Sequence, residues 1–274
     1  MKNLKEKYLN FYNEVTKVLR KPVVSVLPGH LSFFLLLSAI PIIIIFGMIA
    51  NTFSLSYDNI TDFITHSLPA GTSKVILPLF NTKAPNISYL LLIFSAIYIA
   101  SRGTKAIILT SNNIYDVNRK AFQDVIKSIV LTILIIILMI FTTVILVLGG
   151  KILRLLNTIN GIGFFSKGII DSIDIFRWPI SFLIVYFSIK LIYLLAPNKK
   201  INRKSVRKGS LFTTISWIVV TFIYSFYITH YASYDDYYGG ASNLIILMIW
   251  VFIISQIFVI GMIINSIEYK KDNY

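Results

Sequence analysis

The chain of 274 residues contains no cysteine, so disulfides, thiolate nucleophiles and cysteine-based metal sites are excluded. Its three histidines, His30, His66 and His230, are scattered and form no i, i+4 pair, so a histidine metal site is not expected. Charged residues make up only 14% of the chain, against about a quarter in an average soluble protein. With 56% hydrophobic residues, this balance indicates a membrane protein.

Sequence patterns for catalysis are also missing. The chain has no glycine-rich phosphate loop, no convincing Ser-His-Asp arrangement and no HxxxH metal pair. A metal-dependent ribonuclease would need clustered histidine and aspartate ligands, which three isolated histidines do not supply. We therefore expect no enzyme activity, no bound metal and no cofactor.

What the sequence does contain is six apolar runs, each close to the 20 residues that a helix needs to cross a bilayer. They cover residues 31–50, 87–109, 128–149, 178–196, 210–231 and 243–265. The second run includes Arg102 and Lys105, the fourth Lys190 and the sixth Gln256. The predicted fold is an all-α polytopic membrane protein, with residues 1–274 forming a single transmembrane domain.

Lysine and arginine between the runs predict the orientation. Residues 2–21 and 199–208 hold six of these cations each, whereas residues 232–242 hold none, only Asp235 and Asp236. By the positive-inside rule both termini are cytoplasmic, which predicts a multi-pass protein of the bacterial cytoplasmic membrane. The net charge of +14 is then explained by topology and by anionic lipid head groups, so nucleic acid is not expected as a partner.

The segments outside the runs carry weaker signals. Residues 1–28 form a cytoplasmic segment, in which residues 4–19 place apolar side chains on one face and predict an amphipathic helix at the membrane interface. A signal peptide is the alternative for the first run, but that run is longer than a signal core and lacks a clear cleavage site. Residues 51–86 and 150–176 predict short amphipathic helices on the outer side.

Several stretches, taken in order, resemble the YihY/BrkB family of bacterial inner-membrane proteins. They are "GHLSFFLLLSAIPIIII" near the start, "SRGTKAIILTSNNIYDVNRKAF" after the second run, "YLLAPN" with "KGSLFTTISW" before the fifth, and "YSFYITHYASYDDYYGG" with "LMIWVFIISQIFVIGMIIN" in the last hairpin. Two positions depart from the family pattern. Ile263 stands where the family commonly has Glu, and Ser242 replaces a usual Gly.

The resemblance implies a role in virulence and, from one branch of the family, transport of lipid A precursors across the inner membrane. The family was also once labelled a ribonuclease. Because Ile263 replaces the usual carboxylate, a mechanism that depends on that group is not expected in this chain.

The candidate ligand site lies in the cytoplasmic half of the second and fourth runs. Arg102, Lys105 and Asn112 share an arc of one helix, and Lys190 lies at a similar depth. One interpretation is that the three cations snorkel to the interface. The other is that they hold an anion, because no Asp or Glu lies inside any run to pair with them. Asn112 and Tyr115 would order the inner mouth of such a site.

Other residues are candidates for shaping or gating the helices. Pro41 would kink the first run or break it to line a cavity, and Gly103 would let two backbones approach. Gln256 would form an interhelical hydrogen bond. Gly239 belongs to a turn into the sixth run, and Gly261 matches the family resemblance within that run.

The predicted function is binding or translocation of an anionic amphiphile, a phospholipid or a lipid-linked envelope precursor. The alternative is a structural or assembly protein of the envelope that moves nothing. The expected partners are anionic membrane lipids, and self-association into a homo-oligomer is left open. No nucleotide site is evident, so energy would come from a gradient or from a partner protein.

Overall fold

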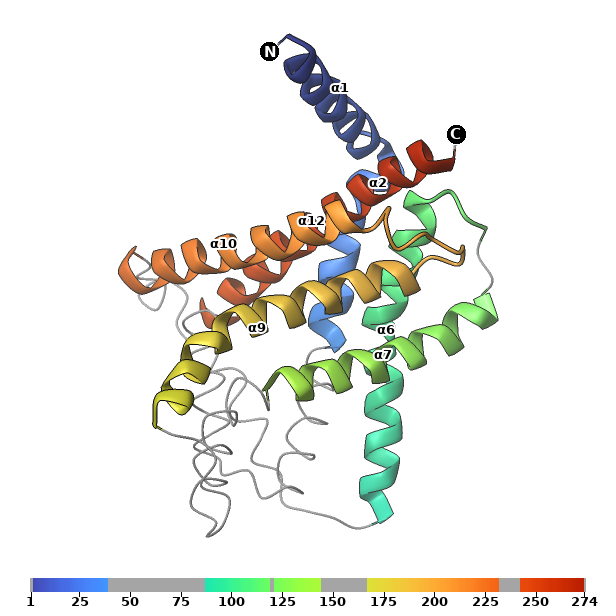
Figure 1. Ribbon diagram of the computed structural model, residues 1–274. Coiled ribbons are helices and arrows are strands. Elements are labelled where there is room, and N and C mark those ends of the chain that lie inside the picture. The colour runs from blue at the N-terminus through green and yellow to red at the C-terminus, as the bar shows by residue number, and fades with distance from the viewer. Residues whose placement is uncertain (1, 39–86, 119–120, 144–166, 232–241, 274) are drawn as a thin grey trace.

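The computed structural model describes residues 2–38, 87–118, 121–143, 167–231 and 242–273 (Figure 1). All regular structure in these ranges is helical, as the apolar runs predict. The helices are α1 (Lys2–Leu19), α2 (Pro22–Ser25), α6 (Ile87–Ile114), α7 (Ala121–Thr143), α9 (Lys167–Leu195), α10 (Arg207–Tyr231) and α12 (Ser242–Asn273). Residues 27–38 are also helical.

Three of the described segments are long and apolar enough to cross a membrane: Ala121–Leu138, Arg207–Tyr227 and Ile245–Asp272. The bent pair Phe11–Leu19 and Pro22–Ser38 makes a fourth if it forms one broken span, and Pro179–Leu195 is a shorter apolar helix. The prediction of an α-helical membrane protein is therefore confirmed. Six spans with cytoplasmic termini stay a prediction, since residues 39–50 and much of the outer segments lie outside the described part.

Helix ends differ from the predicted runs because hydropathy marks only the apolar part of a helix. α7 begins at Ala121 rather than 128, and α12 continues to Asn273 rather than 265. α9 begins at Lys167 and passes through Pro179, where the sequence predicted a start. Interior prolines are tolerated in membrane helices because neighbouring groups can satisfy the freed carbonyl. Residues 167–176, predicted as a separate outer helix, are thus the first turns of α9.

α1 is amphipathic, as its sequence predicts. Phe11, Val15 and Val18 on one face pack against the core, while Leu9 and Tyr12 are exposed. The helix meets the segment 22–38 at 80°, so the two cannot lie along one axis. The C-terminal part of α12 lies close to the junction of these two segments (Figure 1).

α10 and α12 approach each other most closely at two glycines. A Cβ on Gly261 would collide with the hydroxyls of Thr213 and Tyr193, and one on Gly209 would collide with the Gly261 carbonyl and Asn265. The Tyr193 hydroxyl bonds with Thr213 at 2.7 Å and donates to the Phe258 carbonyl at 2.8 Å. Gly261 therefore has a packing role, because small residues let membrane helices approach.

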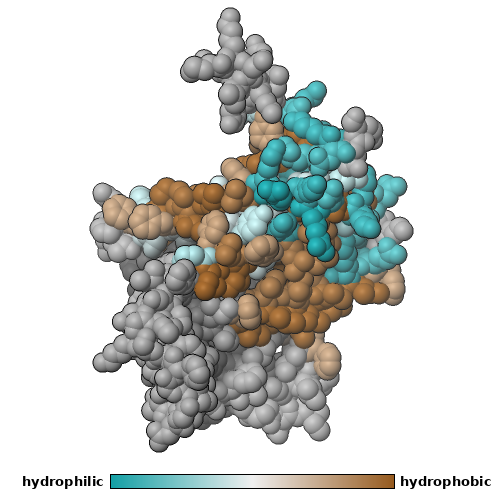
Figure 2. Space-filling view, in the orientation of Figure 1, coloured by the Kyte–Doolittle hydropathy of each residue, from teal (hydrophilic) through white to brown (hydrophobic). Residues whose placement is uncertain are grey.

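α6 ends in a left-handed cap. Asp116 has φ of 52°, and the Val117 amide donates to the Asn112 carbonyl at 2.9 Å, the long-range bond of a Schellman motif. The chain therefore turns sharply after Ile114. Hydrophilic side chains gather at the end of the molecule where α6, α9 and α12 finish, and apolar side chains cover the helices beside it (Figure 2). This polar end holds the candidate site.

Candidate functional site

The segment between α9 and α10, residues 196–206, is called the basic loop here because it carries Lys199, Lys200, Arg203 and Lys204. Its first residues are held by Lys127 of α7. The Lys127 ammonium donates to the carbonyls of Ala196 at 3.0 Å and Pro197 at 2.7 Å, and to Asn198 Oδ1 at 2.9 Å. An ammonium has three protons, so this geometry uses all of its donors.

Asn198 links the basic loop to two further helices. Its backbone amide donates to Asn112 Oδ1 at 2.8 Å, and its side chain donates to Asp124 Oδ1 at 2.5 Å. Asn112 and Asp124 are almost completely buried. Buried polar groups are costly unless they are paired, so this network fixes the start of the loop against α6 and α7.

The far end of the basic loop is fixed as well. Ser205 donates to Asp272 of α12 at 2.6 Å, and Ile201 and Val206 are buried in the core. Lys200 and Arg203 are exposed between these anchors. The loop is thus held at both ends and in the middle, and its four cations are exposed.

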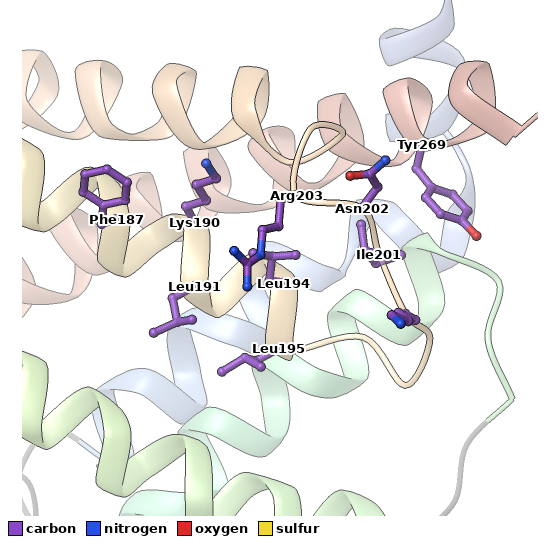
Figure 3. Close-up of a pocket in the computed structure, with 10 residues that line it drawn as sticks. Phe187, Lys190, Leu191, Leu194, Leu195, Ile201, Asn202, Arg203 and Tyr269 are labelled. Carbon is purple, nitrogen blue, oxygen red and sulfur yellow. The ribbon is translucent and has the colours of Figure 1, made fainter.

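A cavity of about 800 Å³ lies between the basic loop, the C-terminal part of α9 and the end of α12 (Figure 3). Its apolar wall includes Phe187, Leu191 and Leu195 of α9. Its cations are Lys190 of α9 and Lys200 and Arg203 of the basic loop, and Tyr269 of α12 also lines it. In Figure 3 the Arg203 side chain extends from the loop across α9, near Leu194.

The cavity has a strongly positive character. None of the described lining residues is acidic. Nearby carboxylates are engaged elsewhere: Glu268 with Lys208 at 2.8 Å, and Asp116 with Lys270 at 3.8 Å. Within the described chain Lys200 and Arg203 form no ion pair, and Lys190 lies over the rings of Tyr186 and Phe187 at 5.7 and 5.9 Å. Cations beside an apolar wall can bind a ligand whose anionic group contacts the cations and whose hydrocarbon tail contacts the wall.

The last residues of α12 contact several other segments at the hydrophilic end of the molecule. Five consecutive residues contact four parts of the structure: Glu268 contacts α10, Tyr269 and Lys270 contact the end of α6, Lys271 contacts α1, and Asp272 contacts the basic loop. Such exposed ion pairs are individually weak. Together they fix the position of Tyr269 in the wall of the cavity.

The three cations that the sequence groups into one site, Arg102, Lys105 and Lys190, do not all line the cavity. Lys190 lines the cavity, but Arg102 and Lys105 are not among its lining residues. Arg102 is exposed on α6, donates to the Tyr98 hydroxyl at 3.1 Å and lies 5.3 Å from the centre of that ring. Lys105 is half-buried. Asp116, which follows the end of α6, pairs with Lys270.

Asn112 and Tyr115 do not line the cavity but contact residues of the basic loop and of the cavity wall. Asn112 holds the basic loop through Asn198, as described above. Tyr115 is 7% exposed and packs edge-on against Tyr269, with ring centres 5.9 Å apart. Burial, with a smaller contribution from Tyr269, raises the pKa of the Tyr115 phenol well above its usual value. Both residues therefore support the site rather than line its main cavity.

The predicted structural residues have mixed outcomes. Gly103 is buried, and a Cβ there would collide with the Ser38 side chain. Gln256 is half-buried on α12. Pro41 and Gly239 lie outside the described residues.

The residues that sequence reasoning missed are Lys127, Lys200, Arg203 and Tyr269. Lys200 and Arg203 were counted only as topological charges. A usable signal was the apolar Ile201 between them, which indicates a loop that packs against the core rather than one that is solvated throughout. Lys127 carried no signal, because its acceptors lie about 70 positions away in the sequence.

No group of three or more potential metal ligands occurs within the described ranges. The long apolar helices, the exposed apolar surface and the hydrophilic end together define a helical membrane protein. Residues 15–274 match the family model described as "Virulence factor BrkB", and the chain belongs to this family.

Individual relatives agree with this assignment. The ribonuclease-like protein YfkH of Bacillus subtilis (strain 168) is 30% identical over 248 residues, covering 89% of both chains. A UPF0761 membrane protein of Vibrio cholerae is 25% identical over 277 residues, covering 97% of this chain and 89% of its own. One from Alteromonas mediterranea is 23% identical over 265 residues, covering 90% and 87%. No solved structure matches the chain.

Proposed function

We propose that this protein binds an anionic amphiphile from the cytoplasmic leaflet as the first step of moving it across the membrane. The observation that carries the proposal is the cavity of about 800 Å³, in which Lys200 and Arg203 of the basic loop and Lys190 of α9 lie beside the apolar side chains of α9. A phospholipid or lipid-linked envelope precursor offers the matching chemistry, a phosphate joined to a hydrocarbon tail.

The two kinds of wall make different demands on the ligand. Arg203 can form two parallel hydrogen bonds to a phosphate, while the lysines act as point charges. Phe187, Leu191 and Leu195 would contact the start of an acyl chain. A soluble anion would leave this apolar wall unused, so the pair of walls favours an amphiphile.

The proposal includes a membrane orientation. Both termini would be cytoplasmic in a multi-pass protein of the bacterial inner membrane, and α1 would lie along the inner interface with Leu9 and Tyr12 toward the lipid. Its 80° angle to segment 22–38 supports this placement, because a helix in the interface must turn to enter the bilayer. The basic loop and the end of α12 would then face the anionic inner leaflet.

We propose no catalytic step and no nucleic-acid partner. The ribonuclease-like name of YfkH belongs to that protein, and the cations of the basic loop lie at the hydrophilic end of the molecule, where lipid head groups would lie. The alternative, a structural protein of the envelope, would need no selective lipid site.

The test is the affinity of the purified chain for phosphatidylglycerol, measured by native mass spectrometry. Each cation near an anionic head group is worth about 1 kcal/mol, so Lys200→Gln with Arg203→Gln should weaken binding about thirtyfold. Lys204→Gln is the matched control, because Lys204 is exposed on the same loop but does not line the cavity. Equal affinities for the double variant and the control would refute the proposal.

A further inference from the structure

The basic loop has a second hollow on its other side, against α7. This hollow, of about 570 Å³, is called the α7 pocket here. Gln123, Ile126 and Val130 of α7 form one wall, and Pro197, Lys199 and Lys200 of the loop form the other. Lys200 lines both the α7 pocket and the larger α9 cavity, so a single loop separates two cationic hollows.

The α7 pocket is also positive. Lys127, Lys199 and Lys200 line it, and none of its described lining residues is acidic. Lys127 donates its hydrogen bonds to the basic loop, and the Lys199 ammonium lies 4.9 Å from the centre of the Tyr269 ring. Asp124, the nearby carboxylate on α7, is buried and accepts a hydrogen bond from Asn198. The exposed donors are Gln123, Lys199 and Lys200, of which Gln123 and Lys200 are the donors proposed for an anion.

Each hollow continues into an exposed apolar stripe along one helix. On α7 the stripe consists of Ile126, Val130, Ile133, Ile137 and Phe141, all at least two-fifths exposed. At 1.5 Å per residue it is about 22 Å long, which exceeds the roughly 15 Å thickness of one leaflet's hydrocarbon. On α9 the corresponding stripe consists of the exposed Ile180, Leu183, Phe187 and Leu195, with the half-buried Leu191 among them. A cationic hollow at the end of such a stripe fits a lipid whose tail lies along the helix.

We propose that the α7 pocket is a second head-group site, so that the protein holds two anionic phospholipids side by side, one on each face of the basic loop. This rests on the proposed function, because it assigns the same class of ligand to both hollows. The two sites do not merge, since Lys127 and Asn198 hold the intervening segment against α6 and α7.

Two isosteric substitutions separate the sites. Gln123→Glu places a negative charge in the α7 pocket alone, at the exposed first turn of α7, where a helix terminus tolerates an acid. Asn202→Asp does the same in the α9 cavity and keeps the oxygen that accepts from the Lys204 amide. Each variant therefore changes one hollow and serves as the control for the other.

The experiment is native mass spectrometry of the full chain titrated with phosphatidylglycerol, with phosphatidylcholine as the neutral comparison. The wild-type chain should bind two phosphatidylglycerol molecules tightly, and each variant should bind one tightly and the other at least tenfold more weakly. Inorganic phosphate in excess should displace neither, because it makes no tail contacts.

The outcomes distinguish this inference from the proposed function. One tightly bound lipid that Gln123→Glu does not affect would overturn the second site and leave the first intact. One bound lipid weakened by both substitutions would mean a single ligand straddling the loop, which also overturns it. Displacement by inorganic phosphate would overturn the assignment to a lipid. Absence of any preference for phosphatidylglycerol would refute the proposed function itself.

Discussion

Replacing Lys127 with methionine tests how the basic loop is held in place. Methionine keeps the apolar stem but removes three hydrogen bonds, to Ala196, Pro197 and Asn198. Hydrogen bonds to a charged group contribute about 1.5–3 kcal/mol each when buried. Because Lys127 is only half-buried and such terms do not add, we expect a total loss of about 3 kcal/mol in the free energy of unfolding.

Asp124 adds to this cost. It is 1% exposed and lies one turn before Lys127, so removing the lysine leaves a buried carboxylate with less compensation. Asp124→Asn in the Lys127→Met background should therefore recover part of the lost stability, giving a coupling energy of about 1 kcal/mol in a double-mutant cycle.

The assay is unfolding by dodecyl sulfate in mixed micelles, followed by tryptophan fluorescence. Trp217 and Trp250 report on the packing of α10 against α12, since each donates a hydrogen bond across that interface. Lys200→Met is the control, because Lys200 is exposed and makes no hydrogen bond within the described chain. A Lys127→Met cost below 0.5 kcal/mol, or strict additivity with Asp124→Asn, would refute this account of the loop.

Three further predictions follow from individual contacts. Gly261→Ala should destabilise the protein by about 1–3 kcal/mol in the same assay, because the methyl group collides with Thr213 and Tyr193, whereas Gly29→Ala, with open space around it, should not. Arg102→Lys should change phosphatidylglycerol affinity less than twofold, because the exposed Arg102 guanidinium contacts Tyr98. A loss of affinity near thirtyfold would instead support the anion-binding role that the sequence predicts for Arg102. Tags at both termini should be inaccessible to an impermeant label in intact cells, and labelling of either from outside would contradict the proposed orientation.

The sequence predicted the helices well because their signal is local. Apolar runs of bilayer length and the one-sided pattern of residues 4–19 are sufficient to place α1, α7, α10 and α12. Their ends were less accurate, since the polar turns of α12 beyond residue 265 carry no hydropathy signal. Those turns are held by contacts with distant segments, such as Lys271 with Glu14 and Asp272 with Ser205.

The candidate site was predicted only in part for a similar reason. Depth in the membrane placed Arg102, Lys105 and Lys190 together, but depth says nothing about which side of a bundle a residue faces. Lys190 lies beside the basic loop, whereas Arg102 projects from α6 onto Tyr98. Lys200 and Arg203, which line the cavity together with Lys190, come from the basic loop. The position of this loop depends on Lys127 and Asn198, and such long-range contacts leave no periodic pattern in the sequence.

The most direct test of the central claim is the lipid that the protein retains from its own membrane. The protein would be purified under mild detergent, and its bound lipids compared by mass spectrometry with the bulk membrane, for the wild type and for Lys200→Gln with Arg203→Gln. The account predicts selective enrichment of an anionic amphiphile in the wild type and loss of that enrichment in the double variant. A bulk-like lipid profile in the wild type would contradict it and favour a structural role in the envelope.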